Sequence, residues 1–474
     1  MTALHEFTAL ELYQLLQRRE ISPVELAAAY LERIGRLDPG IGAFATVTPE
    51  AALERARFVE DHVPTAAPLW GLPIADKDLH RRAGVPARFG SRAFADFVPD
   101  DSDEVVQAVD AAGAVSLGKT ATPEFGLPSY TESLAAPPTR NPWDPTLGAG
   151  GSSGGAAAAV ASGMLPFAPG SDGGGSIRIP AAACGLVGVK PSRGRVPSAS
   201  GLASLAGLGV AGPIARTVAD AALLLDGMVA PRGYPAAHRF ATRAPGDDGP
   251  FLGAAIRGEG RYQLGTMTDS PWDDAYEITV APEAHAALER AIAAFEGLGH
   301  GVEAMRPAPE PGYPEAFRTI WQAGAATIPV EGEAEALLEP LTRWLLLRGR
   351  AVPARQLAEA LAWLSGFEER VIRRFASFDA VLTPALAHTP PSVGWYDQAD
   401  GERNFAQQVQ FTPFTSFVNV AGLPAITVPV DETASGLPMG VQLIGRPGGE
   451  ATLFALAAQL ERRMRRGQRH PPSW

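Results

Sequence analysis

The chain has 474 residues, 46% of them hydrophobic, so it can bury a large core, and its length alone would allow two or three domains. A formal net charge of −12 argues against nucleic acid or an anionic membrane surface as the main partner. The sequence shows neither a signal segment nor eighteen uninterrupted apolar residues, and its single cysteine, Cys184, excludes an internal disulfide. We therefore expect a cytoplasmic protein that does not span a membrane, with Cys184 buried in its core.

Two helix starts are marked near the N-terminus. Thr8 and Ser22 are each followed three residues later by a glutamate, the pattern of a capping box. Pro23 follows Ser22 directly and suits the first position of a helix. The helix after Ser22 is expected to run to about Arg36, where the Asp-Pro-Gly sequence at 38–40 would stop it.

Residues 71–75 read as a short buried strand that runs into Asp76 and Lys77. Taken alone, a lysine at this place is more readily explained as a surface residue paired with a neighbouring aspartate. Strand alternation would point Asp76 away from Lys77. If Asp76 instead faced the lysine, it would favour the ammonium form and weaken Lys77 as a base.

Hydrophobic periodicity and turn residues predict the remaining elements. Residues 314–378 are expected to be mostly helical, and their aromatic and leucine side chains could form either core or the wall of a pocket. The other expectations are a helix over 102–114, a strand over 115–118, a loop over 207–214, a helix ending near Met228, an irregular excursion over 232–260, a helix over 283–298, central strands over 378–384 and 425–430, and a last helix over 450–463.

The stretch 147–197 holds two clusters of glycine and serine, at 150–155 and 170–176, separated by the small apolar run 156–164. A flexible linker would be polar throughout, whereas this apolar run must be buried. The glycines are therefore expected to permit close backbone approach and unusual backbone angles. Three glycines directly before Ser176 would also align unobstructed N–H donors, as an oxyanion hole requires.

These motifs resemble those of the amidase signature family of serine hydrolases. The similarity is carried by Gly-Gly-Ser-Ser-Gly-Gly at 150–155 and by Gly-Ser-Asp-Gly-Gly-Gly-Ser-Ile-Arg at 170–178, and it extends from 71–78 to 436–445. The resemblance implies an α/β fold in which a large mixed central β-sheet is covered by helices on both faces. It also implies one domain over residues 1–474, in which 314–378 lines the substrate pocket.

The resemblance implies a Ser-cisSer-Lys mechanism that needs neither a cofactor nor a metal ion. Ser176 would be the nucleophile, Ser152 the bridging hydroxyl and Lys77 the base, with a cis peptide bond before Ser152. The expected oxyanion donors are the N–H groups of Gly173, Gly174, Gly175 and Ser176, and the expected supporting residues are Ser153, Asp172 and Arg178. Arg178 could bind a substrate carboxylate or form a buried ion pair with Asp172.

None of the eight histidines lies in a setting comparable with these serines. His80 is the nearest in sequence to the expected site, and we interpret it as an ordinary surface or loop residue.

The expected function is hydrolysis of amides through an acyl-enzyme. The tryptophan and leucine residues between Phe317 and Phe367 favour hydrophobic or aryl amides, and the same chemistry would extend to esters and carbamates, as in a urethanase. The alternative is the amidase subunit of a tRNA-dependent amidotransferase, but residues 204–209 lack the Ser-Ser-Leu-Asp-Gln-like stretch usual in that subunit. The sequence leaves the oligomeric state open, a homodimer included.

Overall fold

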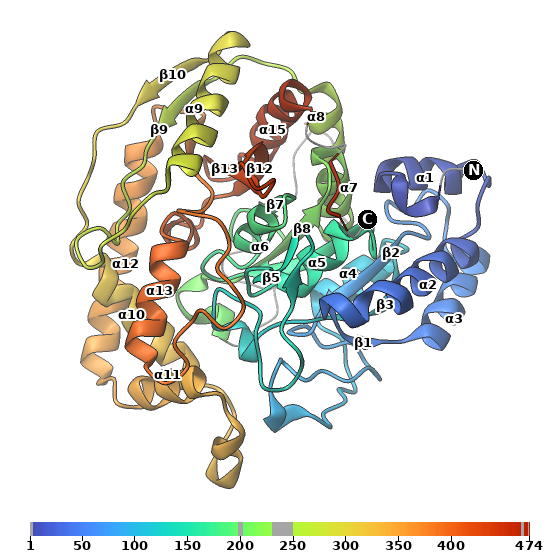
Figure 1. The fold of residues 1–474 in the computed structure, drawn as a ribbon, viewed down its shortest axis with the longest axis horizontal. Helices are drawn as coiled ribbons and strands as arrows, with labels where there is room; N and C mark the ends of the chain where they lie inside the picture. The colour runs from blue at the N-terminus through green and yellow to red at the C-terminus, as the bar shows by residue number, and fades with distance from the viewer. Residues whose placement is uncertain (1–2, 198–201, 230–249, 466–468, 473) are drawn as a thin grey trace.

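The computed structural model describes residues 3–197, 202–229, 250–465, 469–472 and 474. Its largest sheet has eight strands in the order β10-β9-β11-β13-β12-β7-β8-β6, beside a three-stranded sheet of order β1-β3-β2 and the hairpin β4-β5 (Figure 1). The strands are β1 Phe44–Val47, β2 Pro73–Lys77, β3 Val115–Thr120, β4 Arg140–Asn141, β5 Asp144–Gly148, β6 Phe167–Asp172, β7 Val187–Lys190, β8 Val210–Ala215, β9 Gln263–Thr266, β10 Gly301–Ala304, β11 Ala380–Pro384, β12 Ala425–Glu432 and β13 Pro438–Gly445.

The α-helices of the described residues lie before, between and after these strands in the chain. They are α1 Ala9–Gln17, α2 Pro23–Ile41, α3 Pro49–His62, α4 Glu104–Ala111, α5 Gly154–Ala161, α6 Arg178–Ala183, α7 Val218–Met228, α8 Phe251–Arg257, α9 Pro282–Gly297, α10 Tyr313–Ala325, α11 Pro340–Arg350, α12 Ala354–Phe375, α13 Gly401–Phe411, α14 Ser416–Val420 and α15 Glu450–Met464. None of the helices in the described ranges has the length and apolarity that crossing a membrane requires.

The eight-stranded sheet is mixed. Strand β9 runs parallel to both of its neighbours, β10 and β11, whereas the pairs from β11 to β6 are antiparallel. The predicted fold class is confirmed, since helices also cover both faces of this sheet.

Successive side chains of β13 point to opposite faces of the eight-stranded sheet. Val441 and Leu443 belong to the main core cluster together with Leu456 of α15. Gln442, between them, points to the other face and accepts a hydrogen bond from Arg178 of α6 at 2.7 Å. Helices α9 and α15 therefore cover one face, and α6 covers the other.

The small sheet brings β2 beside the large one. Strand β2 pairs in parallel with β3, and it also packs against β6, the edge strand of the large sheet. All five residues of β2 are buried. The end of β2 and the end of β6 therefore meet at the junction between the two sheets.

The two predicted capping boxes are both present, at Thr8 and at Ser22. The helix after Ser22 is longer than expected, because α2 continues through Pro39 to Ile41. A proline in the last turn removes only one backbone hydrogen bond, and the helix ends instead at Gly42, whose φ of 71° is left-handed.

Two predicted irregular segments are wrong in the described residues. The expected loop over 207–214 contains strand β8, which sits between β7 and β6 and is buried throughout. The part of the 232–260 excursion that the structure describes contains α8, whose Phe251 is buried against α15. Residues 232–249 of that expectation lie outside the described residues.

The predicted helical segment over 314–378 corresponds to α10, α11 and α12. Its aromatic side chains divide between the two expected roles: Phe367 is buried in a core cluster, whereas Trp321 is half-buried and lines a cavity. Core and pocket wall are thus both found within this segment.

Strand β2 is anchored by an ion cluster around Asp76. The Arg82 guanidinium lies 2.6 Å from Asp76 and 2.8 Å from Asp110, and Ser116 donates to Asp76 at 3.1 Å. Burial alone would raise the pKa of the Asp76 carboxyl, but the charge and hydrogen bond of Arg82, together with other nearby cations, outweigh burial and hold that pKa below its ordinary value. Asp76 thus faces away from Lys77, as strand alternation predicts.

Removal of the Arg82 guanidinium should destabilise the fold, because it leaves the buried Asp76 carboxylate without its counter-charge. We expect Arg82→Ala to lower the free energy of unfolding by roughly 3–5 kcal/mol in urea denaturation. The control is Arg18→Ala, which breaks an exposed pair with Glu20 and should cost less than about 1 kcal/mol. Equal costs for the two variants would contradict this account of β2.

Candidate active site

Three segments far apart in the chain meet at the junction of the sheets. Lys77 ends β2, Ser152 precedes α5, and Ser171 lies near the end of β6. The Lys77 amine donates to the Ser152 hydroxyl at 2.8 Å, to the Ser171 hydroxyl at 3.1 Å and to the Ser171 carbonyl oxygen at 3.3 Å. The base and the bridging hydroxyl expected from the sequence are therefore in direct contact.

The Lys77 amine is fully buried. Burial lowers the pKa of Lys77 to about 7, although attraction to the Asp172 carboxylate offsets part of this effect. A neutral amine is thus a well-populated form near neutral pH, and a neutral amine can accept a proton from a hydroxyl.

Each carboxylate near this lysine has another cation as its partner. Asp76 is paired with Arg82, and Asp172 with Arg178 at 2.9 Å. On the other side of Lys77, the Asp78 carboxylate lies 3.3 Å from the amine of Lys119. These pairings keep the neighbouring negative charges from holding the Lys77 amine in its protonated form.

Ser176 is 8% exposed. Ser176 lines the same cavity as Ser152. The peptide bond between Gly151 and Ser152 is cis, as the resemblance implies. The N–H of Ser153 donates to the Ser176 carbonyl oxygen at 3.0 Å, so the two glycine-serine clusters are joined directly.

Ser153 also joins its cluster to β6. Its hydroxyl donates to the Ser171 carbonyl oxygen at 3.2 Å and accepts from the Ser171 N–H at 3.3 Å. The predicted supporting residue Ser153 therefore fixes the backbone that carries Ser171 against the start of α5.

The glycine run before Ser176 presents fewer free donors than expected. The N–H of Gly175 donates to the Asp172 carboxylate at 2.7 Å, so it is already engaged. For the N–H groups of Gly173, Gly174 and Ser176, the described residues supply no acceptor. The predicted set of oxyanion donors is therefore reduced to these three.

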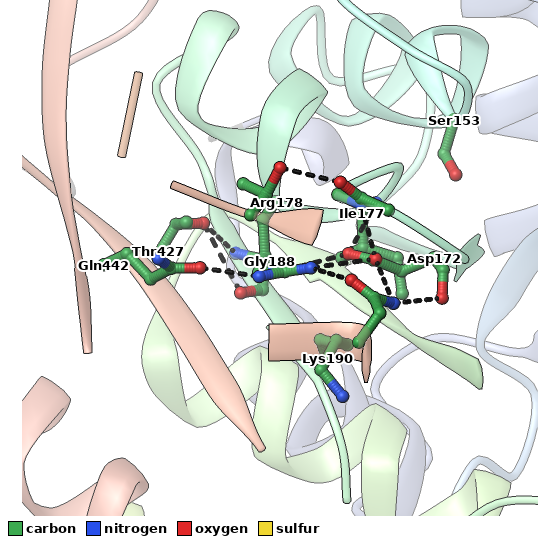
Figure 2. A network of polar contacts seen from close by, with 12 residues as sticks. Ser153, Asp172, Ile177, Arg178, Gly188, Lys190, Thr427 and Gln442 are labelled. Atoms are coloured by element: carbon green, nitrogen blue, oxygen red, sulfur yellow. Dashed lines mark hydrogen bonds and ion pairs between the residues drawn. The ribbon is translucent and has the colours of Figure 1, made fainter. Parts of the chain in front are cut away.

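Arg178 forms the buried ion pair with Asp172 that was one of its two expected roles. Figure 2 shows its guanidinium between Asp172 and Gln442. It donates twice to Asp172, at 2.9 and 3.0 Å, once to Gln442 at 2.7 Å and once to Asn419 at 2.5 Å. Arg178 is fully buried and does not line the cavity beside the serines.

The charge of Asp172 is stabilised by the same network. Burial alone would raise the pKa of the Asp172 carboxyl, but the charge and hydrogen bonds of Arg178, together with Lys190 and Asn419, outweigh burial and hold that pKa below its ordinary value. The ionised carboxylate can thus accept hydrogen bonds from Gly175 and Ile177, at 2.7 and 3.2 Å, and shape the loop before Ser176.

A cavity of about 240 Å³ opens beside the serines. Apart from the catalytic candidates and Asp172, its walls are mostly apolar. They include Leu79, Phe89, Phe125, Leu127, Ile320 and Trp321. Gly126 also lies there with a φ of 67°, and a Cβ on it would come within 3.1 Å of the Ser152 hydroxyl, so glycine leaves room for this side chain.

His80 lies in the loop that follows β2, as one of its two expected settings has it, but it is not at the surface. His80 is 5% exposed and lines the cavity. Its Nδ1 lies 3.8 Å from the Asp103 carboxylate, and neither ring nitrogen has a hydrogen-bond partner among the described residues. Nothing in the local sequence signals this burial, because the other residues that line the cavity with His80 come mostly from distant segments of the chain.

No role in the chemistry is predicted from the sequence for Ser171 or Cys184. Ser171 lies inside the second glycine-serine cluster, so a search for every hydroxyl in that cluster could have found it. Cys184 is buried as expected, and burial raises the pKa of its thiol. Within the described ranges, no three His, Cys, Asp or Glu side chains are grouped so that they could hold a metal ion.

The chain is similar to known proteins over most of its length. The amidase family profile matches residues 25–454. A putative amidase of Synechocystis is 36% identical over 489 residues, covering 99% of this chain and 90% of its own. Among solved structures, 6-aminohexanoate cyclic dimer hydrolase complexed with substrate superposes with a TM-score of 0.90 at 30% identity, covering 99% of both chains. A bacterial aryl acylamidase superposes with a TM-score of 0.85 at 26% identity, covering 98% of this chain and 97% of that one.

Labelling of Ser176 by a serine-directed phosphonate should depend on pH through Lys77. Because Lys77 can accept a proton only as a neutral amine and its pKa is about 7, the labelling rate should fall below neutral pH and level off above it. Lys77→Met should slow labelling by roughly 10²–10⁴-fold, the usual contribution of a general base. Mass spectrometry would follow the reaction, with Ser176→Ala as the blank.

Lys190 offers a matched control, because it is also fully buried and burial lowers its pKa to about 7. Its amine donates to the Pro191 carbonyl oxygen at 2.9 Å and is turned away from the Asp172–Arg178 pair in Figure 2. Between pH 7 and 10.5, each of these two lysines is protonated in the unfolded chain and mostly neutral in the folded protein. The free energy of unfolding therefore rises with pH across this window. Both Met variants should therefore be more stable than the parent at pH 7, but only Lys77→Met should lose labelling.

Ser171→Ala tests the second hydroxyl on Lys77. This hydroxyl accepts from the amine and so favours its charged form, and its loss should lower the pKa of Lys77 further. We expect the pH profile of labelling to move to lower pH while the rate above neutral pH falls by less than about 10-fold, since Ser152 keeps its contact. A profile that moves to higher pH would contradict this role.

Proposed function

Because the chain belongs to the amidase signature family, we propose that it hydrolyses the C–N bond of uncharged, hydrophobic or aryl-containing amides. The observation that carries the proposal is the 2.8 Å contact between the buried Lys77 amine and the Ser152 hydroxyl, in a cavity that Ser176 also lines. A base, a hydroxyl relay and a nucleophile are the groups that acyl transfer requires.

In the proposed reaction, Ser176 attacks the amide carbonyl. Its proton passes to the Ser152 hydroxyl while Ser152 passes its own proton to the neutral Lys77, which is possible because a hydroxyl both donates and accepts. The same path then returns a proton to the leaving nitrogen as the C–N bond breaks. Water, activated in the same way, releases the acyl group from Ser176.

The negative charge on the carbonyl oxygen needs donors that are already in place. The unengaged N–H groups of Gly173, Gly174 and Ser176 are proposed for this role. The Asp172 carboxylate supports them indirectly, since it holds the N–H groups of Gly175 and Ile177 and so shapes the loop between them.

Apolar walls support the proposed substrate class. The cavity beside Ser176 is lined mostly by phenylalanine, leucine, isoleucine and tryptophan side chains, and a charged substrate would lose much of its hydration there. Esters and carbamates would form the same acyl-enzyme, so urethane cleavage is a close variant of the proposed activity.

The test is a comparison of kcat/KM across anilides, aliphatic amides, aryl esters, aryl carbamates and small charged amides, with Ser176→Ala as the blank. We expect kcat/KM for anilides to exceed that for small charged amides by at least roughly 10-fold, because each substrate methylene buried in a matching apolar pocket raises kcat/KM by about that factor. The proposal fails if small charged amides turn over best. Glutaminase activity that appears only with added partner subunits would instead support the amidotransferase alternative.

A further inference from the structure

Ser176 lies between two cavities of different size. The larger one, of about 240 Å³, is called the relay cavity here because Ser152 and Ser171 line it. The smaller one, of about 60 Å³, is called the aromatic pocket and is lined by Trp272, Phe317, Phe405, Val409 and Ser416, among others. Ser176, Leu127 and Trp321 belong to both, so the nucleophile reaches into each.

The relay lies on one side only. Among the described residues that line the aromatic pocket, neither Lys77 nor Ser152 is present. When the C–N bond of the tetrahedral intermediate breaks, the nitrogen must take the proton that Ser176 gave up, and Ser152 is the group that hands it over. The leaving nitrogen must therefore lie on the Ser152 side of the reacting carbon.

From this geometry we infer that the relay cavity binds the leaving amine and that the aromatic pocket binds the acyl group. The inference rests on the proposed function. In the acylation step the Ser176 Oγ–carbon bond forms, the C–N bond breaks, and the Ser176 proton ends on the departing amine after passing through Ser152 and Lys77. The acyl group stays on Ser176 and projects to the side without the relay.

The two volumes then set the substrate class. An apolar cavity of about 150 Å³ is enough to hold benzene. The relay cavity exceeds this, and the aromatic pocket, at about 60 Å³, is well below it. The structure assigns to this site the amides of short-chain acids with ring-sized, apolar amines, such as anilides of acids with two to four carbons.

The walls of the aromatic pocket are held in place, so the pocket cannot easily enlarge for a long acyl chain. Trp272 donates from its indole to the Ser416 hydroxyl at 3.0 Å, and Tyr313 shares a hydrogen bond with the same hydroxyl at 2.8 Å. The Trp272 and Phe317 rings pack edge to face at 5.4 Å. Buried and mutually packed side chains of this kind resist displacement.

Two matched variants separate the cavities. Val409, on α13, lines only the aromatic pocket, and Ile320, on α10, lines only the relay cavity, and both are nearly fully buried. One substrate series keeps 4-nitroaniline as the amine and lengthens the acyl group from acetyl to butyryl to hexanoyl. The other keeps acetyl and enlarges the amine, and melting temperatures show that each variant is folded.

We expect kcat/KM of the parent enzyme to fall by roughly 10-fold or more between acetyl and hexanoyl anilides. Val409→Ala should recover the longer acyl groups by a similar factor, and Val409→Leu should penalise butyryl. Ile320→Ala should change selectivity only in the amine series. If Ile320→Ala proves too unstable to assay, Ile320→Val makes the same comparison with a smaller change.

Deacylation gives a second readout, measured from burst kinetics with 4-nitrophenyl esters. The leaving group has departed at that stage, so the deacylation rate constant should still depend on the length of the acyl chain. Val409→Ala should alter that dependence on chain length, whereas Ile320→Ala should not. The reverse pattern would overturn the assignment of the acyl group to the aromatic pocket. The proposed function would still stand in that case, provided that turnover depends on Ser176. Absence of any Ser176-dependent hydrolysis would instead overturn the proposed function itself.

Discussion

The site depends on the buried amine of Lys77, because no neighbouring group fully stabilises its charged form. Lys77 has three carboxylates in its surroundings, yet Asp76 is paired with Arg82, Asp78 with Lys119 and Asp172 with Arg178. Each pair satisfies a buried charge that would otherwise attract the ammonium form of Lys77. Burial can therefore lower the pKa of Lys77 to about 7, so a large share of the amine in contact with Ser152 is neutral near neutral pH.

The same pairs hold the backbone in place. Arg178 links Asp172 to Gln442 on β13 and to Asn419 on α14, so the loop that carries Ser176 is fastened to the central sheet. Arg82 fastens the end of β2 in the small sheet. The ion pairs that neutralise the carboxylates near Lys77 thus also help to set the position of Lys77 relative to the serines.

Local chain properties made much of the fold predictable. The capping boxes, the periodicity of α4 and α9, and the strands β11 and β12 follow from residues within one segment. Strand β8 was missed because its glycine and proline content reads as loop, while its burial between β7 and β6 comes from tertiary pairing. Helix α8 was missed for the same reason, since its apolar face is explained only by α7 and α15.

What the sequence alone determined is a set of candidate groups. Through their resemblance to the amidase signature family, the glycine-serine clusters indicated Ser152, Ser153, Ser176 and the glycine N–H groups, and the pattern ending in Lys77 indicated a candidate base. Only the tertiary structure decided how these groups behave. It showed that Gly175 is already engaged by Asp172, that Asp76 faces Arg82, that His80 is buried beside the cavity, and that two unequal cavities flank Ser176. The physical reason is that pKa, donor availability and cavity volume depend on desolvation and on contacts between residues far apart in the chain, which no local pattern contains.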